Sequence, residues 1–139
     1  MMNQEVRAIM SKDPIVATPT QTIKDVEVLM LDNSLQQLPV TFEGKLVGMV
    51  TVFDLWRANR EGKSDNTLVS DVMSTKIIKI TPKDKVGTAA ELFADQRFKT
   101  LPVVNLDNEL KGVVTAFDVI RISFNEEYPR PILFEEAFR

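Results

Sequence analysis

The chain has 139 residues, of which 44% are hydrophobic and 27% are charged, so its composition is that of a globular protein. It contains no cysteine and no histidine, which excludes disulfide scaffolds, thiolate zinc sites and catalysis by Cys–His or Ser–His pairs. Its net charge of −3 argues against a nucleic-acid-binding surface, which requires clustered lysine and arginine.

Signals for export or membrane insertion are absent from the sequence. The first residues lack the apolar core of a signal peptide. No apolar stretch approaches the roughly 20 residues of a membrane helix; one of the longest runs from Met49 to Phe53 and already includes Thr51. We therefore expect a cytoplasmic protein with neither a membrane nor a nucleic acid among its partners.

The sequence repeats itself once. Four short blocks recur in the same order, at an offset of 63 positions that becomes 64 after one residue is inserted in a loop. We therefore predict a first repeat at residues 1–60, a linker at 61–67, a second repeat at 68–125 and a C-terminal tail at 126–139. The recurring blocks are Met10-Ser11 with Met73-Ser74, Thr18-Pro19 with Thr81-Pro82, Leu38-Pro39-Val40 with Leu101-Pro102-Val103, and Gly48 to Asp54 with Gly112 to Asp118.

The first half of each repeat predicts a short helical segment, a strand and a helix. In the first repeat, apolar spacing predicts one or two helical turns over Val6 to Met10, and β-branched residues predict a strand over Ile15 to Ala17. Thr22-x-x-Asp25 is typical of a capping box that opens a helix. The counterparts in the second repeat are Leu68 to Met73, Ile77 to Ile80, and a helix with Val86, Ala89, Ala90 and Phe93 on one face.

The second half of each repeat predicts a hairpin and a closing helix. Apolar runs over residues 38–42 and 46–52 flank Glu43-Gly44-Lys45, and a helix follows over residues 53–60. The second repeat has the same pattern over 101–105, 110–115 and 117–125. The predicted fold class is α+β, with two β-α-β-β-α repeats packed sheet to sheet, because a unit of about 55 residues is marginally stable alone.

Thr51-x-x-Asp54, which recurs as Thr115-x-x-Asp118, is the most informative motif. One interpretation is a capping box that satisfies amides at a helix start. The other is a binding site, because a helix N-terminus attracts anions and a carboxylate there can accept hydrogen bonds from a ribose diol. Spacing alone leaves both open. Arg57 and Arg121, three positions beyond the aspartates, are predicted to pair with them.

The ordered blocks, Met-Ser, Thr-Pro, Leu-Pro-Val and Gly-x-Val-Thr-x-Phe-Asp, found twice in tandem, resemble a pair of CBS domains over about residues 6 to 124. The resemblance to this family implies two repeats related by a pseudo-two-fold axis. It also implies two clefts for adenosine-containing ligands such as AMP, ADP, ATP or S-adenosylmethionine.

The family's site residues carry over by position. The ribose- and phosphate-binding positions fall on Thr51, Asp54, Thr115 and Asp118. In the family, each cleft joins the Thr–Asp pair of one repeat to the first-strand segment of the other. This implies an adenine pocket from Ile77 and Ile78 facing Asp54, and from Pro14 and Ile15 facing Asp118. The alternative for these apolar side chains is an ordinary core strand.

Cations for a polyphosphate are scarce in this sequence. The family often has a basic residue three positions before the proline of Leu-Pro-Val, and here this position is Lys99 in the second repeat but Gln36 in the first. Residues before the aspartates are Phe53 and Phe117. Lys99 is thus a possible phosphate contact, or a solvated loop charge. AMP, adenosine or S-adenosylmethionine would fit better than ATP.

The sequence is compatible with two functions and argues against a third. The first is a stand-alone regulatory sensor that binds an adenosine ligand and requires no cofactor; the second is a ligand-free module for dimerisation or for docking a protein partner. An enzyme is not expected, since no Asp-x-Asp or similar metal-ligand cluster occurs and the aspartates recur once per repeat, as repeated binding sites would. No catalytic residue and no metal ligand is assigned.

We also expect a homodimer. Its predicted interface is formed by helix faces that carry Val26, Met30, Trp56, Val119 and Phe124, although Trp56 could equally lie in the core. The tail has an apolar cluster at Ile132 to Phe134, after two prolines, and is predicted to dock in an apolar groove across the dimer.

Overall fold

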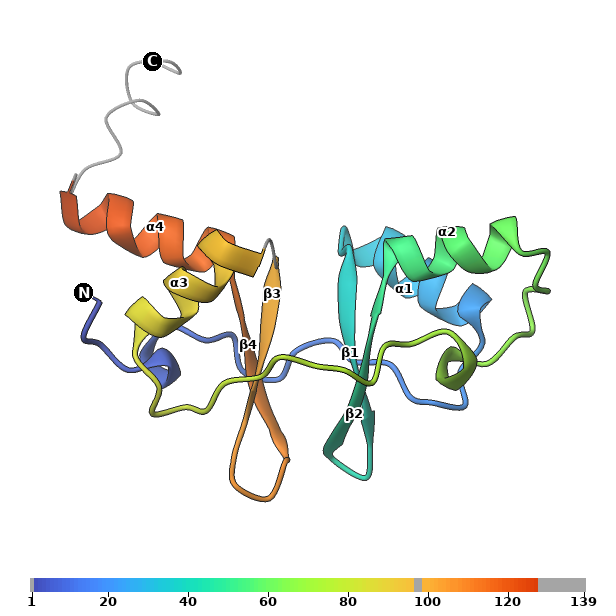
Figure 1. Cartoon of the computed structure of the whole chain (residues 1–139), viewed down its shortest axis with the longest axis horizontal. Helices are drawn as coiled ribbons and strands as arrows, with labels where there is room; N and C mark the ends of the chain where they lie inside the picture. Colours follow the sequence, from blue (N-terminus) through green and yellow to red (C-terminus); the bar gives the residue numbers. More distant parts are fainter. Residues whose placement is uncertain (1, 97–98, 128–139) are drawn as a thin grey trace, which may run out of the picture.

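The computed structural model of the chain describes residues 2–96 and 99–127. It contains two similar halves side by side, each with one hairpin and two helices (Figure 1). The first half has α1 (Ile23–Asn33), β1 (Gln37–Phe42), β2 (Lys45–Thr51) and α2 (Val52–Arg60); the second has α3 (Val86–Gln96), β3 (Thr100–Val104), β4 (Leu110–Thr115) and α4 (Ala116–Glu127); short 3-10 turns, η1 (Val6–Ala8) and η2 (Val69–Asp71), precede them.

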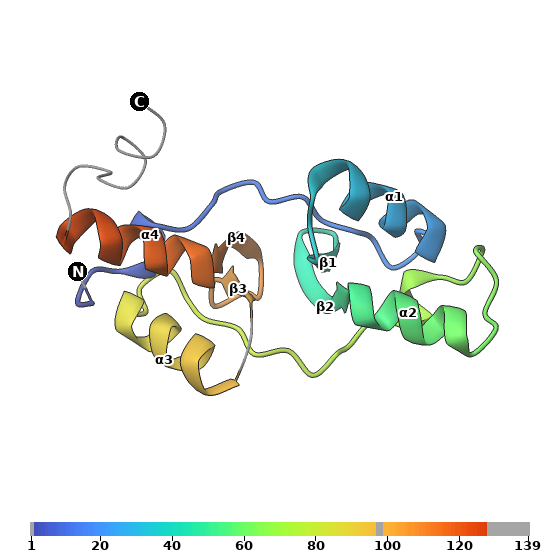
Figure 2. The same ribbon diagram turned by 90° about the horizontal axis from the view of Figure 1, so that it is seen from above.

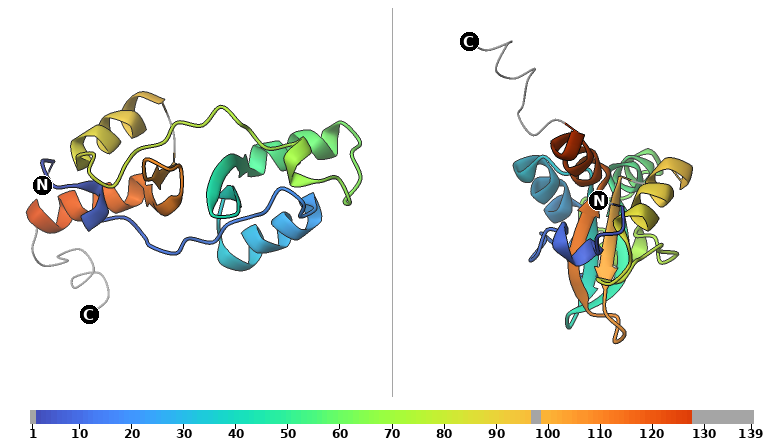
Figure 3. Two further views of the ribbon diagram at one scale, coloured as in Figure 1. Left: turned by 90° about the horizontal axis from the view of Figure 1, so that it is seen from below. Right: turned by 90° about the vertical axis from the view of Figure 1, so that its left-hand side faces the viewer.

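The two predicted hairpins are confirmed and stand back to back in the middle of the molecule (Figures 1 and 2). Strands β1 and β2 pair antiparallel with Leu38 opposite Val50, and β3 and β4 pair with Leu101 opposite Val114. Viewed along the long axis, the two hairpins overlap, and α1 (blue) and α3 (yellow) lie on opposite sides of them (Figure 3), as the predicted α+β pair with a pseudo-two-fold axis requires. Two helices flank each hairpin on its outer side, α1 and α2 beside β1 and β2, and α3 and α4 beside β3 and β4 (Figure 1).

The predicted first strands are much shorter than the sequence suggested. Each is a single parallel bridge, Ala17 to Val40 in the first half and Ile80 to Val103 in the second. The Ala17 N–H donates to the Pro39 carbonyl at 2.9 Å, and Ile80 N–H donates to the Pro102 carbonyl at 3.0 Å. The predicted strands over 15–17 and 77–80 are therefore too long, because most of these residues lie where the chain passes from one half of the molecule to the other.

The opening turn of each repeat packs on the other repeat. Val6 of η1 is fully buried in the core of the second half, together with Val86, Leu101 and Val114. Val69 of η2 is fully buried in the core of the first half. The chain then crosses between the halves, along residues 11–16 and again along residues 74–79, which we call the crossing segments (Figure 2). This exchange ties the two small cores into one unit.

Backbone hydrogen bonds hold each crossing segment to a strand. Ser11 exchanges two with Val113 of β4, at 2.9 and 3.0 Å, and Ser74 exchanges two with Met49 of β2, at 2.8 and 2.9 Å. The hairpin tips are also joined, because Leu46 N–H donates to the Asn108 carbonyl at 3.0 Å. None of the helices in the described ranges has both the length and the apolar character needed to span a membrane.

Candidate functional site at two strand-to-helix junctions

The first candidate site lies where β2 ends at Thr51 and α2 begins at Val52. Asp54 Oδ2 accepts hydrogen bonds from the Thr51 N–H at 2.8 Å and from the Thr51 hydroxyl at 3.1 Å. The Asp54 N–H in turn donates to Thr51 Oγ1 at 3.2 Å. The predicted capping box is thus present. Asp54 is also buried, since the residue is only 8% exposed.

The second repeat has the same arrangement. Asp118 Oδ2 accepts from the Thr115 N–H at 2.9 Å, and the Asp118 N–H donates to Thr115 Oγ1 at 3.0 Å. Asp118 is 7% exposed. Each carboxylate can accept further hydrogen bonds beyond those of its capping box, since an ionised carboxylate offers about four lone-pair positions to donors.

Each aspartate also contacts the arginine one turn further along its helix, as predicted. Arg121 donates to Asp118 Oδ1 at 2.9 Å, and its guanidinium lies 5.6 Å from the centre of the Phe117 ring. The equivalent contact of Arg57 with Asp54 Oδ1 is longer, at 3.5 Å. Asp54 Oδ1 is therefore held more loosely by its arginine than Asp118 Oδ1.

Both helices that carry the aspartates begin near the middle of the molecule and run outward to opposite ends (Figure 1). Their N-termini, each with a partial positive charge, face the centre from the two sides. Amide groups and dipoles at helix N-termini favour anions. The two junctions are thus electrostatically suited to a ligand with a phosphate or carboxylate group.

The residues predicted to contact adenine lie in the crossing segments. Ile15 is 37% exposed and Ile78 is 40% exposed, while Pro14 and Ile77 are partly buried. Ile15 and Ile78 are therefore not core side chains, contrary to the alternative considered for them. The bond between Ser74 and Met49 brings the second crossing segment to β2, the strand that ends at Thr51. Ser11 and Val113 do the same for β4, which ends at Thr115.

Lys99 and Gln36, which occupy equivalent positions in the two repeats, contact each other. Lys99 Nζ donates to Gln36 Oε1 at 2.9 Å. The sequence singled out Lys99 as a possible phosphate contact but gave no role to Gln36. The signal that could have predicted this contact is the equivalence of the two positions in the repeats. Equivalent residues that lie near a pseudo-two-fold axis come close to each other across it.

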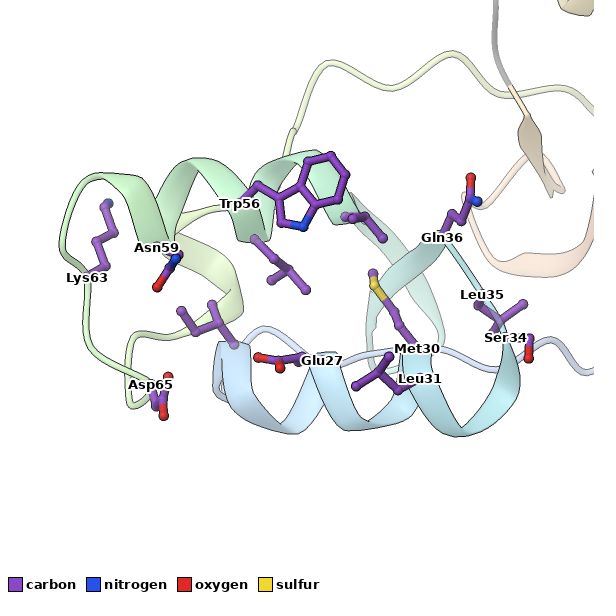
Figure 4. Close-up of a pocket in the computed structure, with 13 residues that line it drawn as sticks. Glu27, Met30, Leu31, Ser34, Leu35, Gln36, Trp56, Asn59, Lys63 and Asp65 are labelled. Atoms are coloured by element: carbon purple, nitrogen blue, oxygen red, sulfur yellow. The ribbon is translucent and has the colours of Figure 1, made fainter.

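A hollow of about 680 Å³ lies between α1 and α2, and neither aspartate lines it. Met30 and Leu31 of α1 and Trp56 of α2 line it (Figure 4). Trp56 is 62% exposed, so it does not belong to the core. Of the other residues expected on a dimer face, Phe124 is exposed but Val26, Met30 and Val119 are buried. The exposed apolar positions on these helices are instead neighbours such as Val28, Leu31, Phe53 and Ile120.

Metal ligands do not gather in the part of the chain that the structure describes: no three Asp, Glu, His or Cys side chains there could hold an ion together.

Comparison with known proteins identifies the repeats. The sequence profile of the CBS domain matches residues 6–57 and 69–125. CBS domain-containing protein YhcV of Bacillus subtilis is 32% identical over 115 residues, which cover 82% of this chain and 81% of YhcV. The uncharacterised protein MJ0188 of Methanocaldococcus jannaschii is 30% identical over 133 residues, 94% of this chain but 48% of its own length. The chain thus spans about half the length of some curated relatives, MJ1225 among them.

Solved structures share the fold. CBSX2 of Arabidopsis thaliana, in a structure with AMP, has a TM-score of 0.82 and 26% identity, covering 88% of this chain and 98% of that one. The CBS domain pair of protein MJ0100, solved with 5′-methylthioadenosine and S-adenosyl-L-methionine, has a TM-score of 0.78 and 25% identity, covering 88% of this chain and 98% of that one.

Proposed function

Because this chain belongs to the CBS domain family, we propose that it is a regulatory module that senses an adenosine-containing ligand at its two Thr–Asp junctions. The observation that carries the proposal is the duplication of one buried carboxylate at a helix N-terminus. Asp54 and Asp118 occupy the same place in both repeats, and each keeps acceptor capacity beyond its capping box.

Each part of an adenosine ligand has a proposed partner. The ribose hydroxyls donate to Asp54 or Asp118, with Thr51 or Thr115 beside them. The adenine packs against Ile77 and Ile78 in one cleft, and against Pro14 and Ile15 in the other. Partial exposure of Ile15 and Ile78 supports this role, because an apolar side chain that no core covers is available to a ring. AMP and methylthioadenosine in the related structures support the same ligand class.

We expect the ligand to carry little negative charge. Phe53 and Phe117, directly before the aspartates, are exposed and uncharged, and Lys99 is the proposed phosphate contact. A triphosphate would be poorly compensated at such a site. We therefore favour AMP, adenosine or S-adenosylmethionine over ATP.

Thermal unfolding with a panel of ligands tests the proposal. A ligand at 100 times its dissociation constant adds about 2.7 kcal/mol to the free energy of unfolding. We expect AMP, adenosine or S-adenosylmethionine to raise the melting temperature, and guanosine monophosphate, which matches AMP in charge, to raise it less. If none of the adenosine compounds raises the melting temperature, the proposal is contradicted.

A second candidate function is a ligand-free module for dimerisation or protein docking. The hollow between α1 and α2 favours it, together with exposed Leu31 and Trp56, which line the hollow, and exposed Phe53, whose ring contacts Trp56. A homodimer through this helical face is compatible with both functions. A dimer that no adenosine compound stabilises would favour this second candidate.

We do not propose an enzymatic activity. Asp54 and Asp118 are both engaged in capping boxes and arranged alike, which suits two binding sites better than one asymmetric catalytic site. Incubation with adenosine nucleotides, followed by chromatography of the products, should show no turnover.

A further inference from the structure

The hollow between α1 and α2 has an apolar middle and a charged outer end. Met30 and Leu31 of α1 and Trp56 of α2 line the middle (Figure 4). Lys63 and Asp65, from the loop after α2, line the outer end. Leu31 and Trp56 are exposed, so the single chain leaves apolar surface open to water here. A segment with a short apolar run next to charged residues would fit this hollow.

The sequence after α4 contains such a segment, at positions outside those that the structure describes. An apolar run at residues 132–134, Ile-Leu-Phe, has Arg130 before it and two glutamates directly after it. Charges of both signs thus border the run, as a lysine and an aspartate border the middle of the hollow. We propose that the apolar run at 132–134 of one chain fills the α1–α2 hollow of a second copy. This inference goes beyond the proposed function and holds whether or not the two Thr–Asp junctions bind a ligand.

The apolar run follows α4 too closely to reach the hollow of its own chain. Helix α4 leads from the middle of the molecule to the end opposite α2, and both hairpins lie between the two helices (Figure 1). A path back covers the 12 residues of α4, about 18 Å, and the spacing of two facing sheets, about 10 Å, before α2 begins. The run ends seven residues after Glu127, which allows at most about 25 Å of extended chain. The hollow that it fills therefore belongs to another chain.

Trp56 provides a direct probe of the hollow, because the sequence contains one tryptophan. The residue is 62% exposed in the single chain. Docking of the apolar run should cover the indole ring, shift its fluorescence to shorter wavelength and slow its quenching by acrylamide. Because docking joins two chains, both effects should be lost on dilution of the full-length protein.

Phe134→Ser should weaken the docking about tenfold or more, the effect of one large apolar side chain that loses its burial. The midpoint of the dilution curve of Trp56 fluorescence should move to higher concentration by that factor. Phe42→Ser is the matched control, because Phe42 is exposed on β1 and does not line the hollow. This control variant should leave the midpoint unchanged.

Mixing two full-length variants tests whether the run of one chain covers Trp56 of another. A Trp56→Phe chain keeps the apolar run but has no tryptophan, and a Phe134→Ser chain keeps Trp56 but has a weakened run. Addition of the first to the second should shift the fluorescence of Trp56 to shorter wavelength. A chain that carries both substitutions should cause a smaller shift or none.

Four results would overturn the inference and leave the proposed ligand sites untouched. A shielded Trp56 whose fluorescence does not change on dilution would show that the run covers its own chain. A dilution curve that Phe134→Ser does not alter would show that other parts of the second copy, such as its helices, cover Trp56. The other two are rapid quenching of Trp56 at every concentration and the absence of a shift on mixing.

Discussion

Gly112 lies so close to the carbonyl oxygen of Ser11 that a Cβ atom at position 112 would stand 2.6 Å from it. Ser11 cannot easily retreat, because it exchanges two backbone hydrogen bonds with Val113. The equivalent Gly48 has a softer neighbour. A Cβ there would meet the Met73 sulfur at 2.5 Å and the Ser74 carbonyl oxygen at 3.1 Å, and a methionine side chain can move aside.

Gly112→Ala should therefore lower the free energy of unfolding by about 1–3 kcal/mol, the usual cost of overpacking. Gly48→Ala should cost less, because a flexible side chain absorbs most of the clash. Urea denaturation of the two variants measures both values. A larger loss for Gly48→Ala would show that the crossing segments are not held as described.

Asp54→Ala and Asp118→Ala should each weaken adenosine binding about 10- to 150-fold, through loss of charge-assisted hydrogen bonds worth roughly 1.5–3 kcal/mol. Calorimetry gives the affinities. Asp25→Ala is the matched control, because Thr22 and Asp25 form the same capping box at the start of α1, away from the junctions. All three variants should lose about 1 kcal/mol of stability. If the affinity for adenosine were unchanged in the Asp54 and Asp118 variants, these aspartates would serve only as helix caps.

Trp56 should stabilise a homodimer. Light scattering at micromolar concentration should give twice the chain mass of 15.7 kDa. Trp56→Ser should shift the protein from the dimer mass towards the mass of one chain. Phe42→Ser is the control, since Phe42 is also an exposed aromatic residue but lies at the end of β1, in the hairpin. Equal dimer affinity in the two variants would exclude the helical face as the interface.

The tail remains a prediction, because residues 128–139 lie outside those that the structure describes. Burial of two side chains among Ile132, Leu133, Phe134 and Phe138 would contribute roughly 3–6 kcal/mol before the cost of ordering. Deletion of the residues after Tyr128 should leave a folded protein that dimerises more weakly. Sedimentation analysis compares the two forms, and an unchanged dimer affinity would refute docking across the dimer.

Glu109 predicts a small pH dependence at the hairpin tips. A hydrogen bond from Asn105 lowers the pKa of Glu109 below its ordinary value of 4.5, with help from nearby Lys111 and Lys45. The pKa is thus lower in the folded than in the unfolded chain. The stabilisation it brings is present above pH 4.5 and is lost as the pH falls through the folded pKa. Glu109→Gln should flatten the dependence of the melting temperature on pH below 4.5; an unchanged slope would contradict the assignment.

Much of the fold was legible in the sequence because it is encoded locally and twice. Thr22 and Asp25 predicted a helix start, the residues around Gly44 predicted a hairpin turn, and both occur where expected. The capping boxes at Thr51 and Thr115 were predicted for the same reason, since partners three residues apart need no knowledge of the tertiary fold. Resemblance to the CBS domain pair supplied the arrangement of the two repeats.

Contacts between distant residues were decided by the tertiary structure alone. Val6 begins the first repeat but is buried in the second half, and Ile15 and Ile78 look like strand residues but are partly exposed. Hydrophobic pattern states that a side chain prefers burial, but not which of two similar cores receives it. Lys99 and Gln36 were visible as equivalent positions 63 residues apart, yet their hydrogen bond exists because the pseudo-two-fold axis brings the starts of α2 and α4 together. That proximity is a property of how the halves pack, and no local pattern of residues encodes it.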